Sequence, residues 1–339
     1  MKYPRLLQKG DAIGVCAPSA GVSEDLFPRL NRAISNVQAL GDTVVETKAV
    51  RSRIKCASAD PETRAAEFMS LYENPEIAAI IPPWGGEFLM ELLPLLDFDK
   101  LAALPPKWIC GYSDLTTLTF PLTLLCGIAT VHGSDFINMG GAKIAESDLQ
   151  AFSVMESAET VQHSAPFCGS FTSEFTDPSK DTYCLSQKNL WKALRGEGHT
   201  AFSGRMLGGC MDTICKLLGT RFAPVSSFLE VYKQDGFIWT LESCEMTAAE
   251  IYRTLWQMRE CGWFRYCSGI IYGRPAEYSD TRDFTLTDAL ERGLGGLGVP
   301  VIYDADIGHI PPLLQVVNGA HGVVEFEDGS AVIRQSLKR

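Results

Sequence analysis

The strongest constraint on the fold is a regular alternation of short apolar segments with helix-spaced segments through the first third of the chain. Five segments read as strands: Ala12–Ala17, Thr43–Glu46, Ile77–Ile81, Lys107–Gly111 and Gly127–Val131. The stretches between them have helical spacing, and parallel neighbouring strands require such crossovers. The alternation predicts an α/β fold with a mostly parallel sheet and helices on both faces.

Local signals mark where these helices begin and end. Gly41 follows the segment Glu24–Leu40 and is a candidate C-cap. Asp60 and Pro61 are typical of an N-cap and a first helical position. A further helix is expected up to Leu96, and another from Leu115, which Pro121 should kink.

The second half predicts a smaller, mixed α/β domain. Residues 145–200 are polar and broken by Pro and Gly, and we expect a linker with irregular strands there. Gly204–Gly219 is expected to be a loop that opens into a helix. Later segments predict strands, one helix and a terminal hairpin: Phe237–Leu241, Thr247–Cys261, Ser268–Tyr272, Val299–Ile302, Val323–Phe326 and Ala331–Arg334. The predicted organisation is an N-terminal domain at 1–150, a connector at 151–200 and a C-terminal domain at 201–339.

Composition narrows the class of protein. The 339 residues carry a net charge of −11, which argues against nucleic acid as a partner. We expect no signal peptide and no membrane span, because no apolar run has the required length. The eleven cysteines form no C-x-x-C pairs and lie mostly in apolar segments, so reduced thiols and a cytoplasmic protein are expected.

Ser113 is the candidate nucleophile. It follows the apolar segment ending at Gly111 and precedes a helix-like segment, which is the strand-turn-helix setting that exposes a catalytic serine. Helix capping is the common alternative for a Ser-Asp pair. Such a serine also needs donors for an oxyanion. The Asp114 N–H and an amide of Gly85 or Gly86 are the candidates, although Pro82–Gly86 could equally be an ordinary turn.

A serine hydroxyl needs a base, and the chain has five histidines. His309 lies in a loop after an apolar strand, between a glycine and two prolines, which would hold an imidazole rigidly. His132 ends a strand of the first domain and could be structural or close to the site. His163, His199 and His321 lie in less constrained places.

The base in turn needs an orienting carboxylate. Glu242 ends an apolar strand, a position from which a charge often points into a crevice. Glu245 is a competitor, although its position suits a helix-start carboxylate. Asp304 and Asp306 are further alternatives.

Several separated blocks, in order, resemble the LD-carboxypeptidase and microcin C immunity family of serine peptidases. They are Gly10–Asp11 to Pro18–Ser19, Trp84–Gly86, Leu92–Asp97, Gly111–Thr116, Gly208–Gly209, Leu218–Thr220, Leu241–Ser243 and Asp306–His309. The resemblance implies a triad of Ser113, His309 and Glu242, and an oxyanion hole formed by the Asp114 and Gly86 amides. It also implies a homodimer that needs no metal or cofactor.

The resemblance leaves two substrate classes. LD-carboxypeptidases remove the terminal D-alanine of muropeptide tetrapeptides and tend to carry Arg-Gly-Gly at the oxyanion turn. This chain has Trp84, Gly85 and Gly86 there, which is closer to the microcin immunity branch and its peptidyl-nucleotide substrates. Trp84 and Gly85 are therefore expected to contact substrate, and Trp191 could stack on a purine or be a buried core residue. Cys210 replaces a residue that is polar in many relatives.

Two other classes of function remain open from the sequence. One is a small-molecule binding protein without catalysis. The other is a cysteine hydrolase or redox enzyme using Cys16 or Cys110, which is disfavoured because both lie in apolar strands without a nearby cation. A dinucleotide-binding dehydrogenase is disfavoured because no G-x-G-x-x-G follows the first strand.

Overall fold

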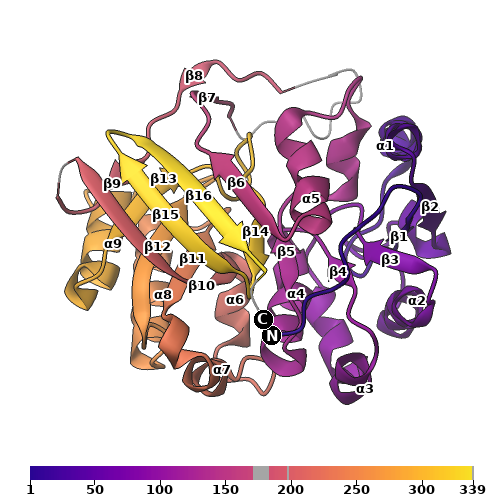
Figure 1. Ribbon diagram of the computed structural model, residues 1–339, viewed down its shortest axis with the longest axis horizontal. Coiled ribbons are helices and arrows are strands. Elements are labelled where there is room, and N and C mark those ends of the chain that lie inside the picture. Colours follow the sequence, from indigo (N-terminus) through magenta and orange to yellow (C-terminus); the bar gives the residue numbers. More distant parts are fainter. Residues whose placement is uncertain (171–182, 197, 338–339) are drawn as a thin grey trace.

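The computed structural model describes residues 1–170, 183–196 and 198–337, so part of the predicted connector lies outside the described residues. Two domains lie side by side, the N-terminal one in indigo to magenta and the C-terminal one in orange and yellow (Figure 1). Among the described residues, no helix is long and apolar enough to cross a membrane. All eleven cysteines are free thiols, as predicted.

The N-terminal domain contains the predicted parallel sheet, in the order β2-β1-β3-β4. Asp60 caps α2 by accepting a hydrogen bond from the Thr63 N–H, and Gly41 ends α1 at a φ of 109°. Helix α1 packs on one face of the sheet and α2 on the other, in two separate apolar clusters. The elements are β1 (Ala12–Val15), α1 (Phe27–Leu40), β2 (Thr43–Glu46), α2 (Pro61–Glu73), β3 (Ile77–Ile80), α3 (Phe98–Ala103), β4 (Trp108–Ile109), α4 (Thr116–Cys126) and β5 (Thr130–His132). Short 3₁₀ helices η1 to η5 cover Glu24–Leu26, Lys48–Arg51, Leu89–Leu95, Ser113–Leu115 and Phe136–Gly140.

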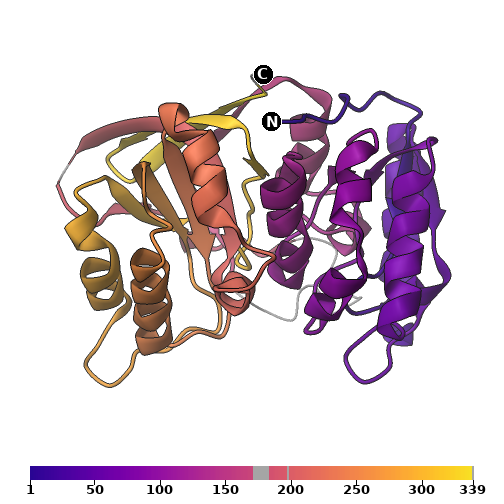
Figure 2. The same cartoon turned by 90° about the horizontal axis from the view of Figure 1, so that it is seen from below.

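The C-terminal domain is built on an eight-stranded mixed sheet, in the order β6-β16-β15-β10-β11-β12-β13-β9. Strands β10 to β13 are parallel to one another, and the outer strands are antiparallel. Helices lie against one face of this sheet (Figure 2). Helix α5 (Glu146–Glu156) packs into the apolar cluster of the first domain. The remaining elements of the second half of the chain are β6 (Glu159–His163), β7 (Phe167–Cys168), β8 (Gln187–Lys188), β9 (Lys192–Ala193), β10 (His199–Cys210), α6 (Met211–Leu217), α7 (Val225–Val231), η6 (Lys233–Asp235), β11 (Phe237–Glu242), α8 (Ala248–Glu260), β12 (Cys267–Gly273), α9 (Leu286–Leu294), η7 (Gly295–Leu297), β13 (Val301–Ala305), β14 (Val316–Asn318), β15 (His321–Glu327) and β16 (Ser330–Ser336).

Two predicted irregular segments are regular in the structure. Part of the expected linker is helix α5, and the expected loop after Gly204 is the central strand β10. The glycines of β10 obscure the strand pattern in the sequence. They are needed because neighbouring atoms leave no room for a side chain. A Cβ on Gly208 would lie 1.8 Å from the Thr240 carbonyl oxygen, and one on Gly209 would lie 2.4 Å from Thr116.

The two domains are joined by backbone pairing. Strand β5 of the first domain pairs antiparallel with β14 of the second, and Val131 of β5 also bridges Cys110 after β4. Helix α4 contacts α6 and β10 across the same junction. The carboxyl ends of β4, β5, β10 and β11 therefore meet where the domains adjoin.

Candidate active site

The turn that carries Ser113 is held in a strained conformation. Ser113 has a φ of +58°, a region that non-glycine residues seldom occupy and that costs roughly 1–3 kcal/mol. A Cβ on the nearby Gly111 would lie 2.1 Å from the Leu115 side chain, so only glycine fits there. A sharp strand-to-helix turn with a strained, half-exposed serine is the geometry of a nucleophile elbow.

Buried carboxyl groups hold this turn in place. The Asp135 side chain accepts a hydrogen bond from the Tyr112 N–H at 3.2 Å. Asp114 accepts from the Ser19 hydroxyl, from the Leu89 N–H at 3.0 Å and from the Thr117 hydroxyl at 3.1 Å. The side chain of Asp114 is therefore used in packing the elbow, whereas its backbone N–H follows Ser113 directly.

The Gly85–Gly86 turn lies against the elbow. A Cβ on Gly85 would be 3.0 Å from the Asp114 nitrogen and 3.2 Å from Ser113 Oγ, so a side chain there would fill the space beside the serine. The Gly85 carbonyl is already occupied, because it accepts a hydrogen bond from the Ala20 N–H. Gly86, Ser113 and Asp114 border one cavity.

This cavity has a volume of about 410 Å³ and lies between the two domains. Its charged lining consists of four carboxylates, of which Asp114 is buried and three are exposed or half-buried, and one lysine: Asp114, Glu87, Asp212, Glu245 and Lys216. Burial raises the pKa of Asp212 to about 6, and it raises that of Glu87 together with the charges of Glu245 and Asp114.

Glu242 and His309 are brought together from strand β11 and the loop after β13. His309 Nδ1 lies 2.9 Å from Glu242 Oε2, and the carboxylate is fully buried. A Cβ on Gly308, whose φ is +105°, would lie 2.5 Å from the same oxygen, which explains the glycine before the histidine. Burial alone would lower the pKa of His309, but the charge and hydrogen bond of Glu242 raise it above its ordinary value.

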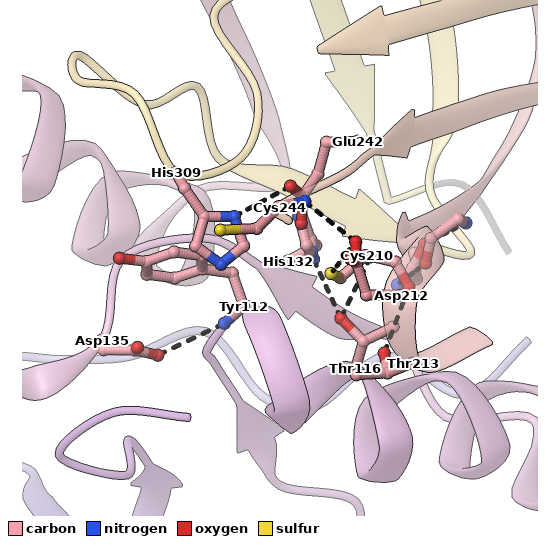
Figure 3. Close-up of polar contacts among 12 residues, drawn as sticks. Tyr112, Thr116, His132, Asp135, Cys210, Asp212, Thr213, Glu242, Cys244 and His309 are labelled. Carbon is pink, nitrogen blue, oxygen red and sulfur yellow. Dashed lines mark hydrogen bonds and ion pairs between the residues drawn. The ribbon is translucent and has the colours of Figure 1, made fainter. Parts of the chain in front are cut away.

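The base and the elbow adjoin across the domain junction. The rings of His309 and Tyr112 meet edge to face with their centroids 4.9 Å apart (Figure 3). Tyr112 immediately precedes Ser113, so the imidazole paired with Glu242 lies beside the residue that leads into the elbow.

The loop that carries His309 is anchored by Asp306. This buried carboxylate pairs with Arg274 at 2.6 Å and accepts hydrogen bonds from the Ala165 N–H and the Asn189 amide, both at 2.8 Å. Trp191 donates its indole N–H to the same carboxylate at 3.2 Å. Asp306 thus anchors the loop that carries His309.

Neither tryptophan expected at substrate is among the described residues that line this cavity. Trp191 is only 2% exposed and lies within an apolar cluster, so its ring offers no surface on which a purine could stack. The alternative interpretation, that Trp191 is a buried core residue, is correct. Trp84 donates its indole N–H to the Gly21 carbonyl at 3.2 Å and lies under the Arg53 guanidinium. Trp84 is not among the residues that line the cavity, whereas its neighbour Gly86 is.

The remaining candidate residues lie in different surroundings. Glu245 lines the cavity, while Asp304 forms an ion pair with Lys192 at 2.8 Å. Cys16 and Cys110 are fully buried, and burial raises the pKa of both thiols, which disfavours a reactive thiolate.

His132 was recognised in the sequence as a residue that could lie close to the site, but no role was assigned to it. Its Nε2 lies 3.6 Å from Glu242 Oε1, on the other side of the carboxylate from His309. Its position at the end of a strand was the one signal available, because a strand end in this fold faces the site.

The chain matches known proteins along most of its length. Residues 13–133 match the family model described as LD-carboxypeptidase N-terminal domain, and residues 203–324 match the one described as LD-carboxypeptidase C-terminal domain. A putative carboxypeptidase of Vibrio cholerae is 27% identical over 97% of this chain and 96% of its own. The microcin C7 self-immunity protein MccF of Escherichia coli is also 27% identical, over 97% of this chain and 94% of its own.

Solved structures show the same fold. The structure of MccF in complex with glutamyl sulfamoyl guanosine superposes with a TM-score of 0.83 at 24% identity, covering 99% of this chain and 98% of the other. A muramoyltetrapeptide carboxypeptidase from Oxalobacter formigenes superposes with a TM-score of 0.73 at 20% identity, covering 96% and 98%. The mixed α/β architecture predicted from the sequence is confirmed.

Proposed function

Because the chain belongs to the LD-carboxypeptidase family of peptidases, we propose that it is a serine peptidase or amidase with Ser113 as nucleophile, His309 as base and Glu242 as orienting acid. The observation that carries the proposal is the His309–Glu242 hydrogen bond, packed through Tyr112 against the strained elbow.

The chemistry follows from the roles of the two ring nitrogens. With Nδ1–H donated to Glu242, Nε2 of His309 is left as the acceptor. It takes the proton of Ser113 as Oγ attacks the substrate carbonyl carbon, and it returns that proton to the leaving amine as the C–N bond breaks. His309 then takes a proton from water, which attacks the acyl-serine ester. The acid product leaves and the Ser113 hydroxyl regains the proton.

Two backbone amides would stabilise the charge that develops on the carbonyl oxygen. We assign this role to the N–H groups of Asp114 and Gly86, which border the cavity beside Ser113. Gly85 contributes by lacking a side chain, because its N–H is already directed to the buried Asp135 carboxyl.

The first candidate substrate is a small peptide or peptidyl-nucleotide, in a role resembling microcin immunity. Support comes from MccF, whose structures include complexes with glutamyl sulfamoyl guanosine and aspartyl sulfamoyl adenosine. The second candidate is a muropeptide tetrapeptide. The murein tetrapeptide carboxypeptidase of Pseudomonas aeruginosa is 20% identical over 88% of this chain and 87% of its own.

The charge of the cavity affects both candidates. Glu87, Asp212 and Glu245 outnumber Lys216, so an acidic acyl group would meet net repulsion on entering. The terminal carboxylate of a muropeptide tetrapeptide would meet the same repulsion, so the lining charge does not separate the two candidates. A homodimer and a cytoplasmic location remain parts of the proposal, and sedimentation of the purified protein tests the first.

The decisive experiment compares both substrates on the wild-type protein and on Ser113→Ala. Products are followed by mass spectrometry with an aspartyl-adenylate analogue and a muropeptide tetrapeptide. Loss of the nucleophile should reduce turnover by at least about 10³-fold while binding persists. Ser226→Ala, which changes an exposed serine on α7, is the matched control.

Three outcomes would contradict the proposal. Activity retained in Ser113→Ala rules out this nucleophile. Activity lost to a thiol reagent but retained in Ser113→Ala would support a cysteine enzyme. Tight binding of either ligand by wild type without any turnover would support a binding protein.

A further inference from the structure

The buried carboxylate of Glu242 is hydrogen-bonded to described residues through only one of its two oxygens. Its Oε2 is paired with His309, but within the described part of the chain Oε1 has no hydrogen-bond partner, although the side chain is fully buried. A buried carboxylate oxygen without compensation is costly. His132 Nε2 lies 3.6 Å away, is equally buried, and also has no hydrogen-bond partner among the described residues. Figure 3 shows Glu242 with the two histidines about it.

The neighbours of His132 fix which nitrogen carries its proton. Thr116 Oγ1 accepts a hydrogen bond from the Cys210 N–H at 3.2 Å, which leaves the hydroxyl hydrogen of Thr116 to be donated. His132 Nδ1 lies 3.5 Å from that oxygen and is the acceptor. The proton of the neutral ring is then on Nε2, the nitrogen that faces Glu242.

We propose that His132 is a positioning residue: as a neutral Nε2–H imidazole it holds Oε1 of Glu242, and so orients the carboxylate that orients His309. The chain of contacts runs from the Cys210 amide through Thr116 and His132 to Glu242, and it joins both domains. This inference rests on the proposed function, because its consequence is the rate of the Ser113 reaction.

Neutrality of His132 is what makes the arrangement useful. Burial lowers its pKa to about 4, with Glu242 raising it and His309 lowering it further. A second cation beside Glu242 would weaken the attraction that stabilises the imidazolium forming on His309. A neutral donor compensates the carboxylate without that competition.

Other titrating groups also face this cluster and must be considered in any pH experiment. Asp212 and Glu245 raise the pKa of His309 along with Glu242. Burial raises the pKa of Glu242, but His309, His132 and the Cys210 thiol lower it, so that its pKa lies below the ordinary value. The Tyr112 ring packs against both imidazoles.

The test compares His132→Gln, which keeps a donor at the position of Nε2, with His132→Leu, which removes it. For Leu we expect kcat/KM to fall about 10- to 100-fold, by analogy with the outer groups that orient metal-bound histidines. Its acid limb should move to higher pH, because a less compensated Glu242 raises the pKa of His309 further. His132→Gln should keep kcat/KM within about fivefold of wild type, and its acid limb should lie at the wild-type pH.

The proposal is overturned if Leu leaves the rate and the pH profile unchanged, or if a folded Gln variant is as impaired as Leu. A second measurement is independent of catalysis. The ¹⁵N spectrum of histidine-labelled Ser113→Ala protein should show His132 as the neutral Nε2–H tautomer at pH 7. A protonated ring or the Nδ1–H tautomer would refute the proposal even if the enzyme is active, whereas an active Ser113→Ala refutes the proposed function alone.

Discussion

Two histidines from different domains flank one carboxylate, and the same burial has opposite outcomes for them. His309, on the loop after β13, is hydrogen-bonded to Glu242 at 2.9 Å and its pKa is raised. His132, at the end of β5, stays 3.6 Å from the other oxygen and its pKa falls to about 4. Contact geometry with the carboxylate, and not depth of burial, separates a histidine whose pKa is raised from one whose pKa is lowered.

The largest effect is expected from removing His309, the histidine of this comparison that we propose as the base. His309→Ala removes the group that accepts the Ser113 proton, so kcat should fall about 10⁴-fold with only a small change in substrate binding. His199→Ala, an exposed histidine on β10, is the control and should keep wild-type rates. A His309→Ala enzyme within tenfold of wild type would remove His309 from the mechanism.

The pH profile sharpens the comparison next. Since Glu242 raises the pKa of His309 above its ordinary value of about 6.5, the acid limb of kcat/KM should lie above pH 6.5 and fall tenfold per pH unit. Glu242→Gln removes that charge, so the limb of its residual activity should move to lower pH. An unmoved limb in Glu242→Gln would show that another group sets it.

The smallest expected effect is on the free energy of unfolding, whose pH dependence reports the titration of His132. Its folded pKa of about 4 lies below the unfolded value of about 6.5, so the unfolded chain takes up a proton first and stability is lost as pH falls through this window. Between pH 7 and 4.5 the wild type should lose about 2 kcal/mol more than His132→Gln, measured by urea unfolding. Equal losses in both proteins would mean that His132 titrates normally.

Much of the first domain was predictable because its signals are local. The caps at Gly41 and Asp60 depend on neighbouring residues only, and the alternation of apolar and helix-spaced segments is readable in one dimension. The second domain was harder to predict. The glycines of β10 are required by contacts with Thr240 and Thr116, residues distant in sequence, so they looked like loop glycines.

The candidate site shows the same division. Strand-end position was enough to nominate Ser113, Glu242 and His309, but it left Glu245, Asp304 and Asp306 as alternatives, and the two tryptophans were nominated by the family resemblance. The indole of Trp191 turned out to be buried against Asp306, where it supports the loop that carries His309.

The sequence by itself determined the order of the strands and helices in the first domain, the family resemblance and the short list of residues able to do acyl-transfer chemistry. Only the tertiary structure decided that Glu242 meets His309, 67 residues away, and that His132 approaches the same carboxylate from the other domain. Residue types and spacing record local propensity, whereas the pairing of buried charges depends on which strand ends the packed domains bring together.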